Sequence, residues 1–234
     1  DVYQLTDDIA KLGFGNSSVQ RRVTKIQGRM YARTWEVSSN GVFAYLLVLL
    51  GGIIGKKTNV ERVVPEWLLG AEKSIKREYL SAFQGGDGSR LSYQKNGDTW
   101  KPCMGMTYQS TRNHLLENAT EYMTQISNLF KEFGIVSNVQ TKPSNEDTTK
   151  VCIVFEKTTK NYANYSDLIG YTYCEEKRRR SASIIEHVKI REYAKNTRDK
   201  GYQYIMDNHI NASMQDMINE TKLTENQIRK VIRN

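Results

Sequence analysis

The sequence has few of the residues that build disulfide frameworks and metal clusters. It contains 3 Cys and 3 His among 234 residues. Cys103, Cys152 and Cys174 are odd in number, lie far apart and lack the paired spacing of a zinc site. The histidines show no ligand spacing either. We therefore expect buried free thiols and exclude a disulfide scaffold or a Cys/His zinc centre.

Long apolar runs are also missing. The longest, Val42 to Leu50, is far shorter than the ~18 residues of a membrane span and fits a buried helix. The first residues do not show the basic, apolar and small-residue series of a signal peptide. A P-loop, a dinucleotide fingerprint and a metalloprotease helix motif are absent too. These absences predict an intracellular globular protein with no membrane partner.

Positive charge exceeds negative charge. The chain has 34 Lys and Arg against 26 Asp and Glu, a formal net charge of +8. Basic proteins favour polyanionic partners because bound phosphates replace condensed counterions. Nucleic acid is therefore the leading partner, although many basic proteins bind none.

The chain contains two similar series of predicted elements. Residues 1–13 predict an amphipathic helix, 19–37 two alternating strands, and Asn40 caps a short apolar helix. A helix is expected at about 72–84, a strand pair at 91–109 with a turn at Asn96-Gly97-Asp98, and then a helix at 114–133, strands at 135–143 and 150–158 and a short helix ending at Gly170. The order of 1–51 recurs in 114–170, which indicates an internal duplication.

We interpret this order as an α/β (α+β) fold of two pseudo-symmetric αββαββα halves with a helical C-terminal extension. The expected domains are 1–70 (a partial first half), 71–176 (the second half) and 177–234 (the extension).

One short segment carries a chemical signature. In LSAFQGGDG, 80–88, small residues permit close helix packing, two glycines end a helix, and Asp87 follows at its C-terminal end. The helix dipole disfavours a carboxylate there unless a cation is bound, so a divalent ion is the natural partner. A solvated Asp-Gly turn is the alternative. The segment resembles the second dodecapeptide motif of LAGLIDADG homing endonucleases, and the resemblance implies that Asp87 is a catalytic ligand of Mg²⁺.

Lysines follow two Gly-terminated helices at similar distances. The stretch GKKTNVERVVPEWLLG, 55–70, resembles the segment before the second motif in intein-type members of that family. In the family, a lysine from each such loop lies near the scissile phosphates, so the resemblance implies catalytic roles for Lys56 or Lys57 and for Lys177. Each lysine taken alone is equally compatible with a solvated surface position.

The resemblance also implies a saddle of antiparallel strands that binds duplex DNA. Basic and amide side chains on the expected strands would face it, although a plain solvated sheet face is the alternative. These candidates are Arg21, Arg22, Lys25, Arg29, Arg33, Lys95, Lys101, Gln109, Gln140 and Lys142, with Arg178 and Arg179 in the following basic cluster.

The last residues predict two short helices. Met214, Met217, Ile218, Leu223, Ile228 and Val231 form their apolar set, and Thr224 would cap the second helix. The pair resembles a small helix-turn-helix that places Arg229 and Lys230 toward DNA. A helical pair that merely packs on the core is about as compatible.

Taken together, the sequence predicts a site-specific, metal-dependent endonuclease that hydrolyses double-stranded DNA. The first acidic motif has no counterpart in 1–70, so we expect an upstream segment or second polypeptide to supply the other motif helix, and cleavage by this chain alone is open. The alternative is a non-catalytic nucleic-acid binder, either a domesticated regulator or an RNA-splicing maturase.

Overall fold

The computed structural model describes residues 1–26, 29–97, 99–103 and 107–233. The side chains of 22–26, 29–35, 96, 99–100 and 108 lie outside this description. The chain divides into two compact units, 1–182 and 183–234. The domain bounds expected from the sequence, and the pairing of two αββαββα halves, stay predictions.

The first helix is held against a segment late in the chain. α1 spans Val2–Ile9 and continues as a π-helical turn, Ala10–Phe14, in which Gly13 has φ 86°. The Glu175 amide donates to Asp1 Oδ1 at 2.8 Å, and the Tyr173 hydroxyl donates to Asp8 Oδ2 at 3.0 Å. The predicted amphipathic helix with its glycine stop is confirmed.

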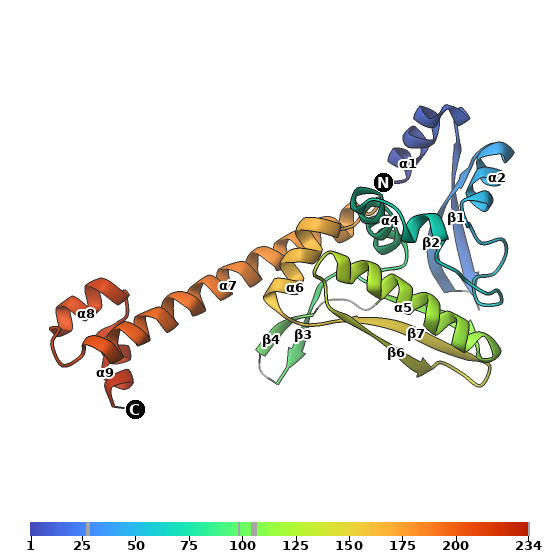
Figure 1. Ribbon diagram of the computed structural model, residues 1–234. Helices are drawn as coiled ribbons and strands as arrows, with labels where there is room; N and C mark the ends of the chain where they lie inside the picture. The colour runs from blue at the N-terminus through green and yellow to red at the C-terminus, as the bar shows by residue number, and fades with distance from the viewer. Residues whose placement is uncertain (27–28, 98, 104–106, 234) are drawn as a thin grey trace. The chain divides into compact units, whose positions relative to one another are not determined.

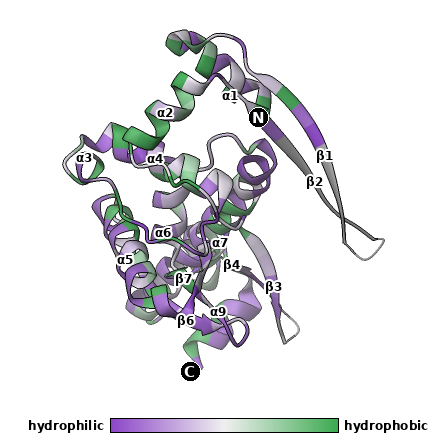
Figure 2. Ribbon diagram, turned by 90° about the vertical axis from the view of Figure 1, so that its right-hand side faces the viewer, coloured by the Kyte–Doolittle hydropathy of each residue, from purple (hydrophilic) through white to green (hydrophobic). Residues whose placement is uncertain are grey.

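A β-hairpin and an apolar helix come next. β1 (Ser18–Ile26) and β2 (Arg29–Ser38) pair antiparallel, and α2 (Gly41–Leu49) begins at Asn40, whose side chain accepts from the Phe43 amide at 2.9 Å. The strands and the cap are confirmed. The predicted burial of this helix is wrong: Val42 is 69% exposed and Tyr45 66%, and Figure 2 shows the helix as an apolar segment. Apolar composition favours burial, but the path of the chain decides whether a helix is covered.

The helix that precedes Asp87 is packed very closely. α3 (Glu66–Leu69) leads into α4 (Lys73–Gly86), which includes both glycines of the motif. Ser81 is 3% exposed. Its backbone oxygen accepts from the Thr172 amide at 3.1 Å, and the two hydroxyls lie 2.7 Å apart. A Cβ at Gly85 would lie 1.8 Å from the Thr172 oxygen. The segment at Thr172 therefore covers the small residues of this helix, on which the sequence predicted that a second motif helix would pack.

Five strands form two further sheets. β3 (Ser92–Asn96) and β4 (Thr99–Cys103) make a hairpin, while β5 (Thr107–Arg112), β7 (Thr148–Phe155) and β6 (Ser137–Pro143) make an antiparallel sheet in the order β5-β7-β6. The run 101–109, expected as one strand, is therefore shared between two sheets. Asp98 of the expected turn lies outside the described residues.

One face of the three-stranded sheet is covered by helix α5 (Figure 1). A 3₁₀ turn, Asn113–Leu115, leads into α5 (Leu116–Glu132), and Gly134 follows at φ 68°. Met123, Ile126 and Phe130 are fully buried. Their spacing places them on one helical face, so they form the core against the sheet.

An aromatic cluster closes this unit. α6 (Thr159–Asn164) runs into a π-helical turn, Tyr165–Ile169, that ends at Gly170. Tyr165 packs edge-on against Phe155 and Tyr171, with ring centroids 5.5 Å away in each case. α7 (Glu175–Asn208) then begins.

The C-terminal unit contains the remainder of α7 with α8 (Met214–Thr221) and α9 (Glu225–Ile232). Its buried core is Ile205, Met217, Leu223 and Ile228, against which Met214, Ile218 and Val231 pack. Thr224 caps α9 by accepting from the Gln227 amide at 3.4 Å. The predicted helices, cap and apolar set are confirmed. Among the helices of the described ranges, none is long and apolar enough to span a membrane.

Candidate functional site

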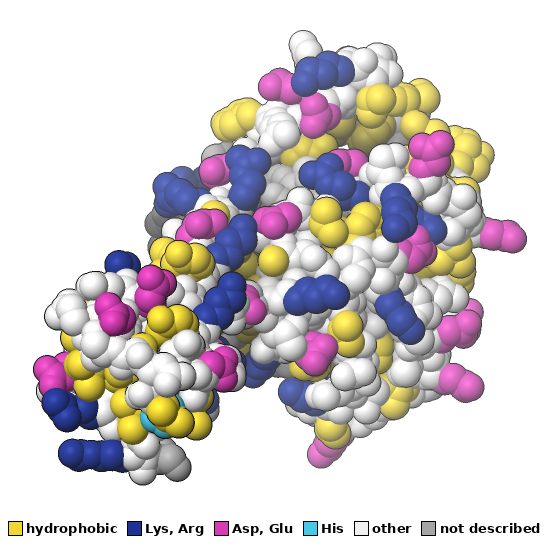
Figure 3. Space-filling model, turned by 60° about the vertical axis from the view of Figure 1, so that its left-hand side comes forward, with side chains coloured by type: hydrophobic (Ala, Val, Ile, Leu, Met, Phe, Trp, Pro, Cys, Tyr) yellow, Lys and Arg dark blue, Asp and Glu magenta, His cyan; other side chains and the backbone are white. Residues whose placement is uncertain are grey.

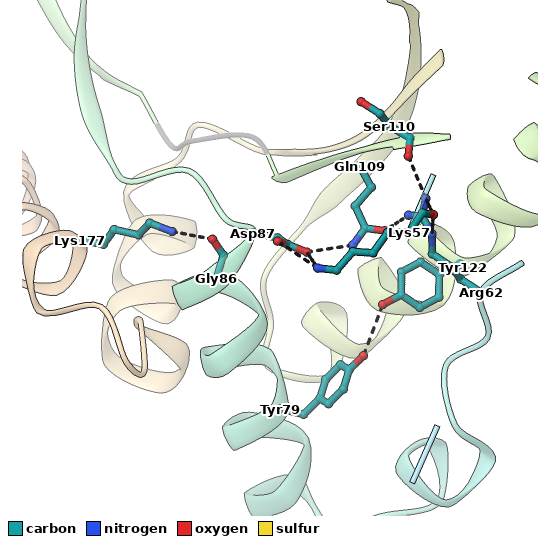
Figure 4. A network of polar contacts seen from close by, with 9 residues as sticks. All are labelled: Lys57, Arg62, Tyr79, Gly86, Asp87, Gln109, Ser110, Tyr122 and Lys177. Atoms are coloured by element: carbon teal, nitrogen blue, oxygen red, sulfur yellow. Dashed lines mark hydrogen bonds and ion pairs between the residues drawn. The ribbon is translucent and has the colours of Figure 1, made fainter. Parts of the chain in front are cut away.

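The polar cluster lies where α4 ends. Asp87 is the C-cap residue of this helix, and its Oδ2 accepts from Lys57 Nζ at 3.1 Å and from Gln109 Nε2 at 3.2 Å. Lys57 Nζ also lies 3.5 Å from Oδ1. Figure 4 shows the carboxylate between Lys57 and Gln109 on one side and the lysine of α7 on the other. Residues 57, 87 and 109 therefore meet from three separate segments.

Lys177 contacts the backbone at the end of α4 and not the Asp87 carboxylate. Its Nζ donates to the backbone oxygens of Gln84, Gly85 and Gly86 at 3.2, 2.6 and 3.2 Å. The three oxygens belong to the last turn of the helix, where that of Gln84 also accepts from the Gly88 amide at 3.1 Å, and a cation there complements the helix dipole. Burial lowers the pKa of Lys177, while nearby Cys174 and Asp87 act in the opposite direction. Lys177 thus lies beside Asp87 but caps the helix that carries it.

Arg62 is buried beneath the cluster and holds several of its members by hydrogen bonds, and the sequence analysis did not identify it. It is 2% exposed. Its guanidinium donates to the Lys57 oxygen at 3.1 and 2.8 Å, to the Ser110 oxygen at 2.9 Å and to Gln109 Oε1. Burial lowers the pKa of Arg62, and the charge of Asp87 counteracts this. Val60, two residues before it, is partly buried and Val64, two residues after it, is buried. The alternation of 60, 62 and 64 was the available sequence signal that Arg62 points inward.

The side chain of Gln84 connects the end of α4 to the core by hydrogen bonds. Its Oε1 accepts from Thr107 Oγ1 at 2.8 Å and from the Tyr165 hydroxyl at 3.1 Å. One turn earlier, Tyr79 and Tyr122 place their hydroxyl oxygens 3.5 Å apart, and burial raises the pKa of Tyr79 far above its usual range. Such a packed surround restricts the position from which Asp87 projects.

The expected strand candidates do not form one surface within the described residues. Gln109 is on the buried side of β5, 9% exposed, so its predicted place on an open nucleic-acid face is wrong. Lys95 pairs with Trp100, and Lys101 with Gln94. Successive cross-strand pairs alternate in face, so Lys95 and Lys101 are on opposite sides of their hairpin. Gln140 and Lys142 are exposed and share one face of β6.

The remaining candidates are exposed, or their side chains lie outside the described residues. Arg22, Lys25, Arg29 and Arg33 belong to the latter group. Lys56 and Arg21 are exposed. Arg178, Arg179, Arg229 and Lys230 are all exposed; Arg178 is paired with Glu175, and Arg229 with Glu225 at 2.6 Å. Figure 3 shows Lys and Arg side chains scattered among acidic ones on the face drawn, so charge alone does not locate a site.

A missed lysine lies on the open face of the three-stranded sheet. Lys142 on β6 is directly opposite Lys150 on β7, and Lys150 is in turn opposite Ser110 on β5. Gln140, two residues from Lys142, is on the same face. Thr149, Val151 and Ile153 of β7 are buried on the side of α5, which places Lys150 on the other face, although Cys152 on that face is buried too.

The donor set near Asp87 fits a divalent ion only in part. Among the residues described, the chain contains no group of three or more His, Cys, Asp or Glu side chains that could hold a metal. Magnesium, however, is commonly held by one or two carboxylates, with phosphate oxygens and waters completing the shell. Asp87, whose side chain is 34% exposed, can contribute to a site of that kind.

Comparison with known proteins revises the functional assignment. No family model matches the chain. It is 29% identical over 209 residues, 86% of its length, to the tRNA-splicing ligase RtcB of Pyrococcus furiosus, and 29% identical over 210 residues, 85% of its length, to the ligase of that name from Methanocaldococcus jannaschii. It is also 24% identical over 206 residues, 82% of its length, to DNA-directed RNA polymerase subunit Rpo1N of M. jannaschii, covering 15% of that protein.

The chain spans about a fifth of the length of the two ligases it matches, 21% of each. Their names contradict the predicted LAGLIDADG family, the metal-dependent hydrolysis of DNA, the maturase alternative and the duplex-DNA partner. We therefore withdraw those four predictions. The similar segments lie in proteins named as tRNA-splicing ligases.

Proposed function

We propose that this chain binds the phosphate backbone of RNA, as one segment of a larger RNA-processing polypeptide. The observation that carries the proposal is the cross-strand pair of Lys142 and Lys150. Like charges directly opposite each other destabilise a sheet. A phosphate bound over this pair would be contacted by both ammonium groups, which favours a polyanionic ligand here.

The surroundings of this lysine pair suit a polar ligand. Gln140 is exposed on the same face of β6, and Ser110 is opposite Lys150 on β5. α5 covers the other face, whereas on this one Gln140 and Lys142 are exposed and Ser110 and Lys150 partly exposed, so their polar groups can meet a ligand. Amide, hydroxyl and ammonium donors contact phosphate and sugar oxygens without reading sequence, so we expect little base preference.

The names of three relatives favour RNA over other polyanions, while a further one, 26% identical over 193 residues, is named Replication factor C small subunit. Two of the proteins are named for tRNA splicing and a third for RNA synthesis. The matching segment is a small share of each, and the names denote different reactions. A segment common to such proteins favours a shared task, holding nucleic acid, over either named reaction.

A divalent ion is the proposed cofactor. Asp87 at the end of α4 would contribute a carboxylate oxygen, and RNA phosphate oxygens and waters would complete the shell. Mg²⁺ is the ion we favour, because the chain supplies hard oxygen ligands at this position and the described residues offer no cluster of softer ones.

The proposal is tested by titrating an unmodified tRNA transcript into the full chain and measuring fluorescence anisotropy over a range of salt concentrations. Lys142→Gln combined with Lys150→Gln should weaken binding and reduce the log–log salt slope by about 1.4, at about 0.7 per phosphate contact. The matched control is Lys131→Gln with Lys160→Gln, which removes the same charge from two exposed helical positions.

Equal slopes for the two double variants would refute the proposed surface. Absence of salt-dependent RNA binding by the unaltered chain would refute the function itself, and a duplex DNA of the same length that outcompetes the transcript would assign a different polyanion.

A further inference from the structure

We propose that the C-terminal unit holds a pocket for a guanosine 5′-phosphate group, either as a free nucleotide or as an unpaired nucleotide of RNA. The pocket lies within 183–234, whereas the lysine pair of the proposed function lies within 1–182. The inference therefore goes beyond the proposed function, and each can be tested without the other.

The pocket lies between α7 and the end of α8. Its volume is about 250 Å³, far more than the roughly 15 Å³ that suffices to hold one water molecule. The lining consists of Thr197, Lys200, Gly201 and Tyr204 of α7 with Glu220, Thr221 and Lys222 at the end of α8. Residues 197, 201 and 204 are three or four positions apart, so they share one face of α7. A space of this size suits a small organic ligand better than a single ion.

Close packing fixes the inner part of this pocket. Gly201 and Thr221 are buried, and a Cβ added at Gly201 would lie 3.1 Å from the Cβ of Thr221. The Thr221 hydroxyl donates to the Met217 oxygen at 2.7 Å and accepts from the Leu223 amide at 3.2 Å. Because these contacts hold the end of α8 against α7, the pocket does not depend on a ligand for its shape.

The lining includes an aromatic residue. Tyr204 is partly buried and packs against the core cluster of the C-terminal unit, so its position is defined. Unpaired nucleotides commonly stack their bases on aromatic side chains, and each such contact contributes substantially to affinity. Tyr204 can therefore serve as the stacking partner of a base.

Charges of both signs meet at the pocket without neutralising one another. Lys200, Glu220 and Lys222 are exposed, and within the described residues none of their side chains has an ion-pair or hydrogen-bond partner. The two ammonium groups suit a phosphate. A carboxylate accepts two hydrogen bonds side by side, and guanine presents two adjacent donors, N1–H and N2–H, on its Watson–Crick edge. These charges therefore match a guanosine phosphate better than the other nucleotides.

Lys222 occupies a position that ordinarily favours glycine. It is the C-cap residue of α8, with φ 58° and ψ 20° in the left-handed region. A side chain in this conformation costs stability, and many helices end on glycine for that reason. Such residues cluster at ligand sites, where binding offsets their cost. The ammonium group of Lys222 at the pocket is consistent with that pattern.

The experiment titrates the four nucleoside 5′-monophosphates into the full chain and measures their affinities by calorimetry. We expect guanosine monophosphate (GMP) to bind at least about fivefold more tightly than the other three, the lower end of the discrimination by a bidentate hydrogen-bond pair. Glu220→Gln should abolish the preference, because an amide offers only one acceptor to the two guanine donors. Glu192→Gln, an equal charge change at an exposed position of α7 outside the pocket, should keep it.

Lys222→Gly separates ligand binding from stability. It should raise the melting temperature of the C-terminal helices, followed by circular dichroism, because glycine adopts the left-handed conformation without strain. It should also weaken GMP binding by about two- to fivefold and leave the binding of guanosine, which has no phosphate, unchanged. Lys195→Gln, at an exposed position of α7 outside the pocket, is the charge control. A purely structural role for Lys222 would not distinguish GMP from guanosine.

Two RNA oligonucleotides distinguish the sources of the ligand. One is a run of uridines, and the other carries a single guanosine in the same run. Tighter binding of the second that GMP abolishes by competition assigns the pocket to a nucleotide of RNA. Equal binding of the two, together with the preference for GMP, assigns it to the free nucleotide.

Three results would overturn the inference. They are GMP that binds no more tightly than the other monophosphates, a guanine preference that survives in Glu220→Gln, and equal GMP affinity in Lys222→Gly and the unaltered chain.

Discussion

The close contact at Gly85 predicts opposite effects for two adjacent substitutions. A Cβ added at Gly85 would lie 1.8 Å from the Thr172 oxygen and 3.0 Å from its carbonyl carbon. Both are backbone atoms, which cannot turn aside as a side chain can. At Gly86, the next residue of the same helix, an added Cβ would meet no atom within 4 Å.

The size of the effect follows from what must separate. Gly85→Ala would push α4 away from Thr172 and strain or break the two hydrogen bonds to Ser81, each worth about 1 kcal/mol, besides an overpacking cost of about 1–3 kcal/mol. Helix propensity returns up to about 1 kcal/mol. We expect Gly85→Ala to lower the free energy of unfolding by about 2–4 kcal/mol, and Gly86→Ala to raise it by up to about 1 kcal/mol.

Urea unfolding followed by tryptophan fluorescence measures the difference in stability between the two variants in the unit that contains α4. All 3 Trp residues, at 35, 67 and 100, lie within 1–182, so the signal does not report on the C-terminal helices. A Gly85→Ala protein as stable as the unaltered chain, or as stable as Gly86→Ala, would show that Thr172 does not press on this helix.

Further changes test other contacts. Lys177→Met should cost about 1–2 kcal/mol through the uncapped end of α4. Because burial lowers the pKa of Lys177, the native state loses this proton at a lower pH than the unfolded state does. As the pH rises toward the ordinary lysine pKa, the unfolding free energy of the unaltered chain should therefore increase relative to that of Lys177→Met. A difference in urea midpoints that does not change with pH would contradict this. Thr224→Ala removes a capping box and should cost about 1 kcal/mol, seen by circular dichroism as earlier melting of the C-terminal helices with the fluorescence transition unchanged. Gly170→Ala places a side chain at φ 65° and ψ −145° and should cost about 1–3 kcal/mol in the fluorescence transition; no loss would mean that the turn relaxes.

Local sequence signals predicted most of the secondary structure. The caps at Asn40 and Thr224 and the stops at Gly134 and Gly170 lie where the pattern placed them, because each depends on a few neighbouring residues. The same holds for the mixture of helices and strands.

Contacts between distant parts of the chain were much harder to predict from the sequence. The apolar helix at 41–49 was expected to be buried, but its exposure depends on where the whole chain runs. From the sequence, Gln109 was predicted to be a surface donor. It lies on the same face of β5 as Thr107 and Thr111, and all three side chains are buried.

The candidate site was predicted in part. The segment 80–88 pointed to Asp87, and the loop before α4 to Lys57, and the structure brings these two residues together. Arg62 was overlooked because a buried arginine in the middle of a valine-rich run has no short motif. The functional reading relied on resemblance over a few letters, and the names of the relatives contradict it.

The hydrogen bonds that hold α1 to the start of α7 have a consequence for how the chain folds. Asp1 and Glu175 are separated by 174 positions, and Asp8 and Tyr173 by 165. During synthesis at about 5–20 residues per second, α1 would wait on the order of ten seconds for its partner to emerge. Contacts of such long sequence separation slow folding, because the intervening chain must be ordered before they form. α1 is synthesised well before the residues that it contacts and is thus among the last elements to dock, so Asp1→Ala should affect the unfolding rate more than the folding rate.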